Sequence, residues 1–150
     1  MIFSKSFGYA VRGVLYIVLM QDTKKYVQAE EIAVQLGVPR HFVSKILKKL
    51  VKAGVLSSSK GKTGGFTVNE ETAGFVLLRL FEITDGLNTF SLCSLRLQEC
   101  NAATPCPLHT PMDNIKQQLR NTLAATTISD LLNTDKEDFI KSIATAGNYQ

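Results

Sequence analysis

Apolar residues in the first part of the chain recur at the spacing of a buried α-helix. The segment over residues 9–20 is almost entirely apolar and carries one charge, Arg12, followed by Gly13. A membrane span needs roughly 20 apolar residues, and no small-residue cleavage site of a signal peptide comes after this segment. The pattern therefore predicts a helix in the core of a cytoplasmic protein.

Two more helices, separated by a short turn, are predicted over residues 29–52. Gly37 allows the tight turn, and Pro39 suits the first position of the second helix. Apolar positions recur at helical spacing in both segments: Ala29, Ile32, Ala33 and Leu36 in the first, and Phe42, Val43, Ile46, Leu47 and Leu50 in the second. The polar and basic opposite face of the second helix is typical of a helix-turn-helix that inserts this helix into the DNA major groove.

The periodicity changes after Gly54, where two short strands are predicted around residues 55–59 and 66–68. The turn between them contains Gly61, Gly64 and Gly65, which let the backbone approach a phosphate closely. It lacks the spacing of a nucleotide-binding P-loop. The segment is therefore interpreted as a wing. The expected fold class is mainly α, a winged helix-turn-helix with a small two-stranded β wing and a long C-terminal dimerisation helix.

Positive charge is concentrated in this half of the chain. The net charge is +4, yet no acidic residue occurs between Glu31 and Glu70, a window that holds seven Lys and Arg residues. The window alone sums to +7, so the rest of the chain sums to −3. Such a one-sided distribution indicates a polyanionic partner.

Double-stranded DNA is the expected partner, because the basic residues coincide with the helix-turn-helix and the wing. The residues predicted to contact it are Arg40, His41, Ser44, Lys45, Lys48, Lys60, Lys62, Gly64 and Gly65. An alternative is a winged-helix interaction module whose basic face binds an acidic protein. An enzyme is least expected, because no paired catalytic carboxylates or nucleophile and base motif is apparent.

All three cysteines lie within fourteen residues, at Cys93, Cys100 and Cys106, with His109 three positions further on. Their odd number and a cytoplasmic setting disfavour disulfides. Because the segment also contains glycine and prolines, it is predicted to be a loop in which ligands can converge. Three thiolates and an imidazole suit zinc or an iron-sulphur cluster, although zinc usually comes with a Cys-x-x-Cys pair. Thiol sensors remain the other alternative.

The segment after Pro111 predicts a helix with a narrow apolar stripe, formed by Met112, Ile115, Leu119 and Leu123. Such a stripe suits a seam between two helices, but it would equally suit packing on the protein's own core. Thr127 and Asp130 are placed to cap a short helix ending near Leu132. Thr134 and Glu137 form a similar capping pattern before the apolar residues of the tail.

The order of these segments resembles the Rrf2 family of bacterial transcription regulators, over about residues 1–132. The resemblance is carried by the N-terminal helix, the helix-turn-helix, the wing sequence over residues 60–66, the Glu-Ile-Thr-Asp-Gly end of the next helix at residues 82–86, and the three spaced cysteines. It implies a homodimer that binds a palindromic operator. It also implies an iron-sulphur cluster that controls DNA affinity in response to redox state, iron or a reactive gas.

The resemblance to IscR-like members places the two-iron or four-iron cluster on Cys93, Cys100 and Cys106, with His109 at the spacing of their histidine ligand. The first gap here is six residues, whereas IscR-like sequences typically have five. NsrR-like members use an acidic residue of the partner's N-terminal helix, but the matching position is Gly8, which leaves His109 favoured. Oxygen can remove such a cluster during purification.

The expected organisation has four parts. Residues 1–86 form the winged helix-turn-helix, residues 87–110 the cysteine-bearing loop, residues 111–132 the dimerisation helix with a short helix, and residues 133–150 a tail with a short helix. The predicted function is sequence-specific DNA binding controlled from the cysteine-bearing loop.

Overall fold

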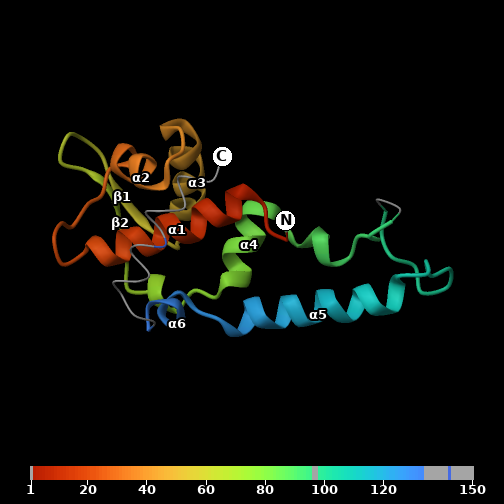
Figure 1. Ribbon diagram of the computed structural model, residues 1–150. Coiled ribbons are helices and arrows are strands. Elements are labelled where there is room, and N and C mark those ends of the chain that lie inside the picture. Colours follow the sequence, from red (N-terminus) through yellow and green to blue (C-terminus); the bar gives the residue numbers. More distant parts are fainter. Residues whose placement is uncertain (1, 96–97, 134–141, 143–150) are drawn as a thin grey trace.

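The structure is a computed structural model that describes residues 2–95, 98–133 and 142 (Figure 1). The elements occur in the order α1 (Lys5–Met20), α2 (Ala29–Leu36), α3 (Arg40–Lys52), β1 (Ser57–Ser59), β2 (Gly65–Thr67), the 3₁₀ helix η1 (Thr72–Gly74), α4 (Leu77–Asp85), the 3₁₀ helix η2 (Leu87–Phe90), α5 (His109–Ala125) and α6 (Ile128–Leu132). This is the expected mainly α winged helix-turn-helix. The tail helix predicted after residue 133 falls outside the described residues.

Helices α1 to α4 form one body, with the β1–β2 wing at one end of it (Figure 1). Helix α5 begins away from the body, beside the loop that precedes it at the end of the molecule farthest from the wing, and then runs back along the body (Figure 1). Within the described part of the chain, no helix is both long and apolar enough to cross a membrane.

Helix α1 is the buried helix that the sequence predicts. Its inward side chains include Phe7, Val14 and Ile17, each at most 4% exposed. Ser4 caps the start of the helix: its hydroxyl accepts a hydrogen bond from the Phe7 N–H at 3.0 Å and donates one to Asp85 at the end of α4. Capping thus ties the start of α1 to the end of α4.

The helix-turn-helix is confirmed, with two differences. Helix α2 ends at Leu36, and the next residue, Gly37, adopts a left-handed φ of 66°. Pro39 precedes α3 at the N-cap position instead of being its first residue. The predicted apolar face of α3 is buried except for Phe42, which is 51% exposed, so its assignment to the core was wrong. At 100° per residue, Phe42 lies on the flank of the stripe formed by the other four residues, and its ring packs against that of His41.

The wing is fixed to the start of α2 by backbone hydrogen bonds. Strands β1 and β2 pair antiparallel in the register Ser57↔Thr67. Val27 and Phe66 exchange two N–H to C=O hydrogen bonds, each of 2.8 Å, and the Gln28 side chain donates to the Lys62 carbonyl at 2.7 Å. These hydrogen bonds between the residues before α2 and the hairpin determine the position of the hairpin relative to the helix-turn-helix.

Replacing Gly65 with alanine is expected to destabilise the protein by about 1–3 kcal/mol. Gly65 has a φ of 142°, and a Cβ atom there would lie 2.6 Å from the Val27 carbonyl oxygen. Urea denaturation measures the effect. Gly74→Ala is the matched control, because a Cβ at Gly74 meets no atom within 4 Å. Equal stability of the two variants would show that the wing is not held as described.

The apolar stripe of α5 divides into two halves. Leu123 is 3% exposed and Leu119 packs against the core, whereas Ile115 is 55% exposed. Helix α5 begins at His109, two residues before the predicted start at residue 111. Pro111 therefore lies in the first turn of the helix, where proline is tolerated. Only the second half of α5 therefore packs on the body of its own chain.

The end of α5 returns to the body beside α4. The Leu77 N–H donates to the Thr126 carbonyl at 2.9 Å, and the Ile128 N–H donates to the Phe75 carbonyl at 3.0 Å. The predicted capping box of Thr127 and Asp130 is present, and α6 ends at Leu132 as expected.

Candidate DNA interface and cysteine pocket

The outward face of α3 brings together the predicted DNA-contacting residues of the recognition helix. They line one open hollow of about 620 Å³, formed by Arg40, His41, Ser44, Lys45 and Lys48. The hollow contains three cationic side chains and a hydroxyl, and the apolar side of the helix faces the core. This face can bind phosphates and base edges.

A second hollow, of about 320 Å³, connects α3 to the wing. Arg40, Ser44 and Lys48 form its helical side, and Gly61, Gly64 and Gly65 form its wing side. A Cβ atom at Gly64 would lie 2.3 Å from the Ser59 carbonyl oxygen, so only glycine fits there. The recognition helix and the hairpin are thus two walls of one groove.

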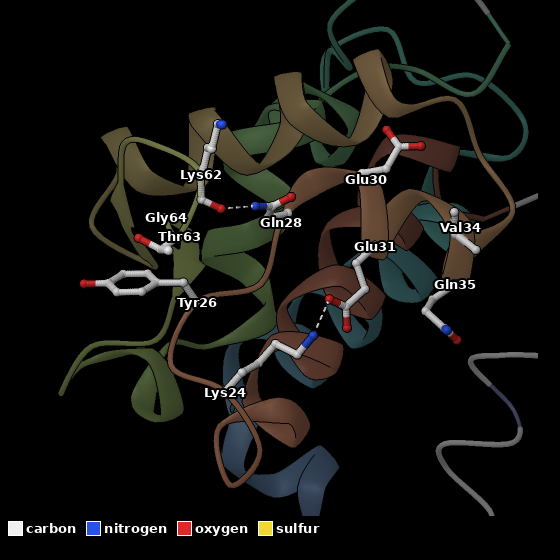
Figure 2. A pocket seen from close by; sticks show the side chains of 10 residues that line it. All are labelled: Lys24, Tyr26, Gln28, Glu30, Glu31, Val34, Gln35, Lys62, Thr63 and Gly64. Atoms are coloured by element: carbon white, nitrogen blue, oxygen red, sulfur yellow. Dashed lines mark hydrogen bonds and ion pairs between the residues drawn. The ribbon is translucent and has the colours of Figure 1, made fainter.

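The two lysines of the hairpin lie at its tip. Lys60 is exposed. Lys62 borders a third hollow, of about 530 Å³, between the wing and α2 (Figure 2). These positions add positive charge at the end of the groove wall, although neither side chain lines the groove itself.

One of the two acidic residues at the start of α2, Glu31, is paired on the side away from α3. Glu31 accepts hydrogen bonds of 2.7 Å from both Lys24 and Tyr16. Burial alone would raise the pKa of Glu31, but these two hydrogen bonds outweigh it and hold the pKa below its usual value. The charge of Glu31 is therefore neutralised by Lys24 and does not weaken the basic face of α3.

Sequence reasoning missed Gln28 and Glu30, which also line the groove between α3 and the wing. Both precede the acid-free window, so the charge pattern excluded them. The signal that could have found them is positional, since the start of the first helix in a helix-turn-helix lies beside the second helix.

The cysteine loop is closed by backbone hydrogen bonds between its two sides. The Cys93 N–H donates to the Gln98 carbonyl at 2.6 Å, and the Cys100 N–H donates to the Ser91 carbonyl at 3.0 Å. Leu92 and Glu99 form an isolated antiparallel bridge. This pairing brings Cys100 next to Cys93, although they are seven positions apart in the sequence.

A turn at Asn101 and the start of α5 place the remaining two candidates. The Asn101 side chain accepts a hydrogen bond from the Ala103 N–H at 2.8 Å, and the His109 N–H donates to the Cys106 carbonyl at 3.0 Å. The Cys93 and Cys106 sulphur atoms are 3.7 Å apart. All four predicted ligands line one small pocket, together with Gln98, Glu99, Asn101 and Thr104.

The thiols of this pocket interact electrostatically. The pKa of Cys100 is raised. The first cause is partial loss of hydration of its thiol next to neighbouring atoms, although the residue is exposed, and the second is the proximity of Cys93 and Cys106, which disfavours a further negative charge. Lys116 of α5 acts in the opposite direction. Three thiolates so close together repel one another, and a bound cation relieves that repulsion.

The donor set fits an iron-sulphur cluster. Thiolates are the usual ligands of such clusters, and imidazole is an accepted replacement. The spacing of the thiols suits a metal in general: two thiolates on one tetrahedral metal, whether zinc or an iron, lie about 3.8 Å apart at about 2.3 Å from it, and the Cys93 and Cys106 sulphurs are at 3.7 Å. Among the described residues, no three His, Cys, Asp or Glu side chains already surround a single metal position.

A continuous set of aromatic contacts joins this loop to the helix-turn-helix. Phe90, three residues before Cys93, packs on Phe81 of α4 with ring centroids 5.3 Å apart. Phe81 in turn packs on Phe7 of α1 at 5.4 Å, and α1 packs on α3. The Lys116 ammonium donates to the Leu92 carbonyl, which attaches the loop to α5 as well.

Comparison with known proteins assigns the chain to a family. The profile of the Rrf2 family, described as iron-dependent transcriptional regulators, matches residues 3–134. A protein of Aquifex aeolicus named as an HTH-type transcriptional regulator is 32% identical over 139 residues, covering 91% of this chain and 95% of the relative.

Two solved structures share the fold. The global cysteine regulator CymR of B. subtilis has a TM-score of 0.72 at 16% identity, covering 89% of this chain and 98% of CymR. T. potens IscR has a TM-score of 0.68 at 17% identity, covering 90% of this chain and 88% of IscR. Proteins of the matched family regulate transcription and are not enzymes. The chain belongs to the Rrf2 family of transcriptional regulators.

Proposed function

We propose that the chain is a cytoplasmic, homodimeric regulator that binds a palindromic DNA operator and whose DNA affinity depends on an iron-sulphur cluster. Cys93, Cys100, Cys106 and His109 would hold the cluster. The observation that carries this proposal is the convergence of all four side chains on one pocket, with the sulphurs of Cys93 and Cys106 at 3.7 Å.

A bound cluster supplies a redox-active centre that also reacts with oxygen or nitric oxide. The chain's own residues determine how its binding affects the fold. His109 must be neutral to act as a ligand, and it is the first residue of α5, so ligation fixes the start of that helix relative to the loop. Ligation by Cys93, three residues after the end of η2 at Phe90, would fix the other side of the loop.

Coupling to DNA arises from the packing. A change in the loop reaches α3 through the rings of Phe90, Phe81 and Phe7 and then through α1. In a dimer the two recognition helices must lie roughly 34 Å apart to enter successive major grooves. A ligand that favours one arrangement of the loop therefore changes DNA affinity without touching DNA.

Exposed apolar side chains around the loop and α5 support the dimer. They are Leu92, Leu95, Leu108 and Ile115, which are 38–57% exposed. The second half of α5 packs on its own chain, which leaves the first half free for a second copy. Light scattering of the purified protein is expected to give twice the mass of the chain.

The proposed cofactor is tested by isolating the protein without oxygen and measuring iron, acid-labile sulphide and visible absorption. We expect a coloured protein with iron and sulphide in equal amounts. A colourless protein after anaerobic reconstitution would exclude the cluster.

A second candidate is a thiol-based or zinc-containing regulator with no cluster. The same close approach of Cys93 and Cys106 favours it, because two sulphurs at 3.7 Å are also placed to respond to an oxidant. Elemental analysis separates the two candidates. Zinc without sulphide, or no metal at all, would support the second.

Replacing Lys48 with alanine is expected to weaken DNA binding and to reduce the slope of log affinity against log salt by about one unit. Lys48 lines both hollows beside the recognition helix, where a phosphate would approach. Salt-titrated fluorescence anisotropy measures the slope. Arg79→Ala is the control, because Arg79 pairs with Glu82 on α4 and lines neither hollow. An unchanged slope for the Lys48 variant would place the DNA elsewhere.

A further inference from the structure

We propose that Glu30 is a positioning residue that makes Arg40 selective for guanine instead of for phosphate, an inference that rests on the DNA recognition proposed above. Both residues line the groove between the recognition helix and the wing. The charge pattern of the sequence gives Glu30 no role there.

The two side chains meet across the turn of the helix-turn-helix. Glu30 is in the first turn of α2, and Arg40 is the first residue of α3. The Arg40 Nε atom lies 3.6 Å from the Glu30 Oε2 atom. In Figure 2 the carboxylate of Glu30 points toward α3, whereas that of Glu31, one residue later, points away to Lys24. Adjacent acids thus have separate partners.

The atom that Arg40 uses for this pair matters chemically. A guanidinium that directs its Nε–H toward a carboxylate keeps its two terminal NH₂ groups available on the outer edge. Two parallel donors match the O6 and N7 acceptors of guanine in the major groove. The N-terminal end of the recognition helix, where Arg40 lies, is where base contacts are usually made.

The carboxylate also acts against a competing contact. An unpaired arginine at the groove edge would bind any phosphate, irrespective of sequence. Glu30 offsets the charge of Arg40 and repels a phosphate that approaches from the side of α2. It therefore lowers general DNA affinity and raises the share of binding that depends on a base.

Stability alone does not account for the pair. Its side chains are 69% and 67% exposed, and ion pairs so exposed contribute little to folding. An acidic residue in the first turn of a helix is favourable by itself, but Glu31 occupies the same turn and already supplies that effect.

The test is selection of binding sites from a randomised duplex library by the full-length protein. Wild type, Glu30→Gln, Arg40→Lys and the control Glu71→Gln are compared. Glu71 is exposed, lies outside the groove and changes the net charge equally. We expect wild type and the control to select a guanine at one position in each half-site. In Glu30→Gln and Arg40→Lys, the preference for guanine over the other bases at this position should fall about tenfold.

A second readout separates positioning from loss of structure. The Glu30 variant should bind random-sequence DNA more tightly than wild type, with a salt slope steeper by about one unit, because Arg40 then takes a phosphate. Its melting temperature should match that of the control. Glu30→Asp should restore part of the guanine preference.

Three results would overturn the inference in distinguishable ways. If Glu30→Gln keeps the guanine preference that Arg40→Lys loses, Glu30 does not position Arg40. If Arg40→Lys changes no base preference, Arg40 binds only phosphates. If the wild-type protein enriches no sequence at all, sequence-specific DNA recognition fails together with this inference.

Discussion

Replacing Cys106 with serine is expected to leave the protein folded but to reduce its iron and sulphide content by at least about tenfold. Cys106 is half-buried in the pocket, and its sulphur lies 3.7 Å from that of Cys93. Serine keeps the size of the side chain but does not supply a thiolate, which is the usual ligand of iron-sulphur clusters. Iron, sulphide and visible absorption after anaerobic reconstitution measure the effect.

Thr104→Ser is the matched control for Cys106→Ser. Thr104 lines the same pocket but carries no thiol, so this variant should load iron and sulphide as wild type does. The Cys106 variant should bind DNA with the affinity of the cluster-free wild-type protein. Full loading of the Cys106 variant would remove this residue from the proposed ligands.

Replacing Phe81 with alanine is expected to lower the free energy of unfolding by about 3–5 kcal/mol. Phe81 is 1% exposed. Its ring packs against those of Phe3, Phe7 and Phe90, with centroid distances of 6.2, 5.4 and 5.3 Å. The substitution therefore leaves a cavity where α1, α4 and η2 meet, and denaturation by urea measures the loss.

Phe42→Ala is the control for the Phe81 substitution, because it removes the same atoms from a ring that is 51% exposed. Its effect on unfolding should stay within about 0.5 kcal/mol. A loss below about 1 kcal/mol for Phe81→Ala would show that the aromatic cluster is not a close-packed centre of the fold. It would also weaken the proposed route between the cysteine loop and α3.

Periodicity and turn residues predicted the helix-turn-helix and the wing, because these elements bury a continuous stripe or strand against one core. The pattern misplaced Phe42, since at 100° per residue it lies on the flank of the stripe that Val43, Ile46, Leu47 and Leu50 form, beyond the part that the core covers. The pattern also could not show which half of the apolar stripe of α5 packs on the body and which half is exposed. Whether Leu119 and Ile115 face the body or solvent depends on where α5 leaves the body, which no local pattern encodes.

In the candidate sites too, local sequence patterns predicted some features, whereas contacts between distant segments could not be predicted. Local charge identified the residues of α3, because neighbouring residues on one helix face share an environment. Glu30 was missed because its role depends on a contact across the turn with Arg40. The clustering of the cysteines predicted a shared site, but backbone hydrogen bonds across the loop bring Cys100 beside Cys93, and the approach of Cys93 to Cys106 is a further contact between side chains. Such pairings are tertiary and leave no signature in composition.

Occupation of the cysteine pocket is expected to change DNA affinity, and all of the proposed regulation depends on this coupling. It is tested most directly by measuring, without oxygen and at one salt concentration, the affinity of the loaded and the cluster-free protein for the same selected operator. We predict affinities that differ by at least about fivefold, as expected for coupled sites. Equal affinities of the two forms would contradict the coupling.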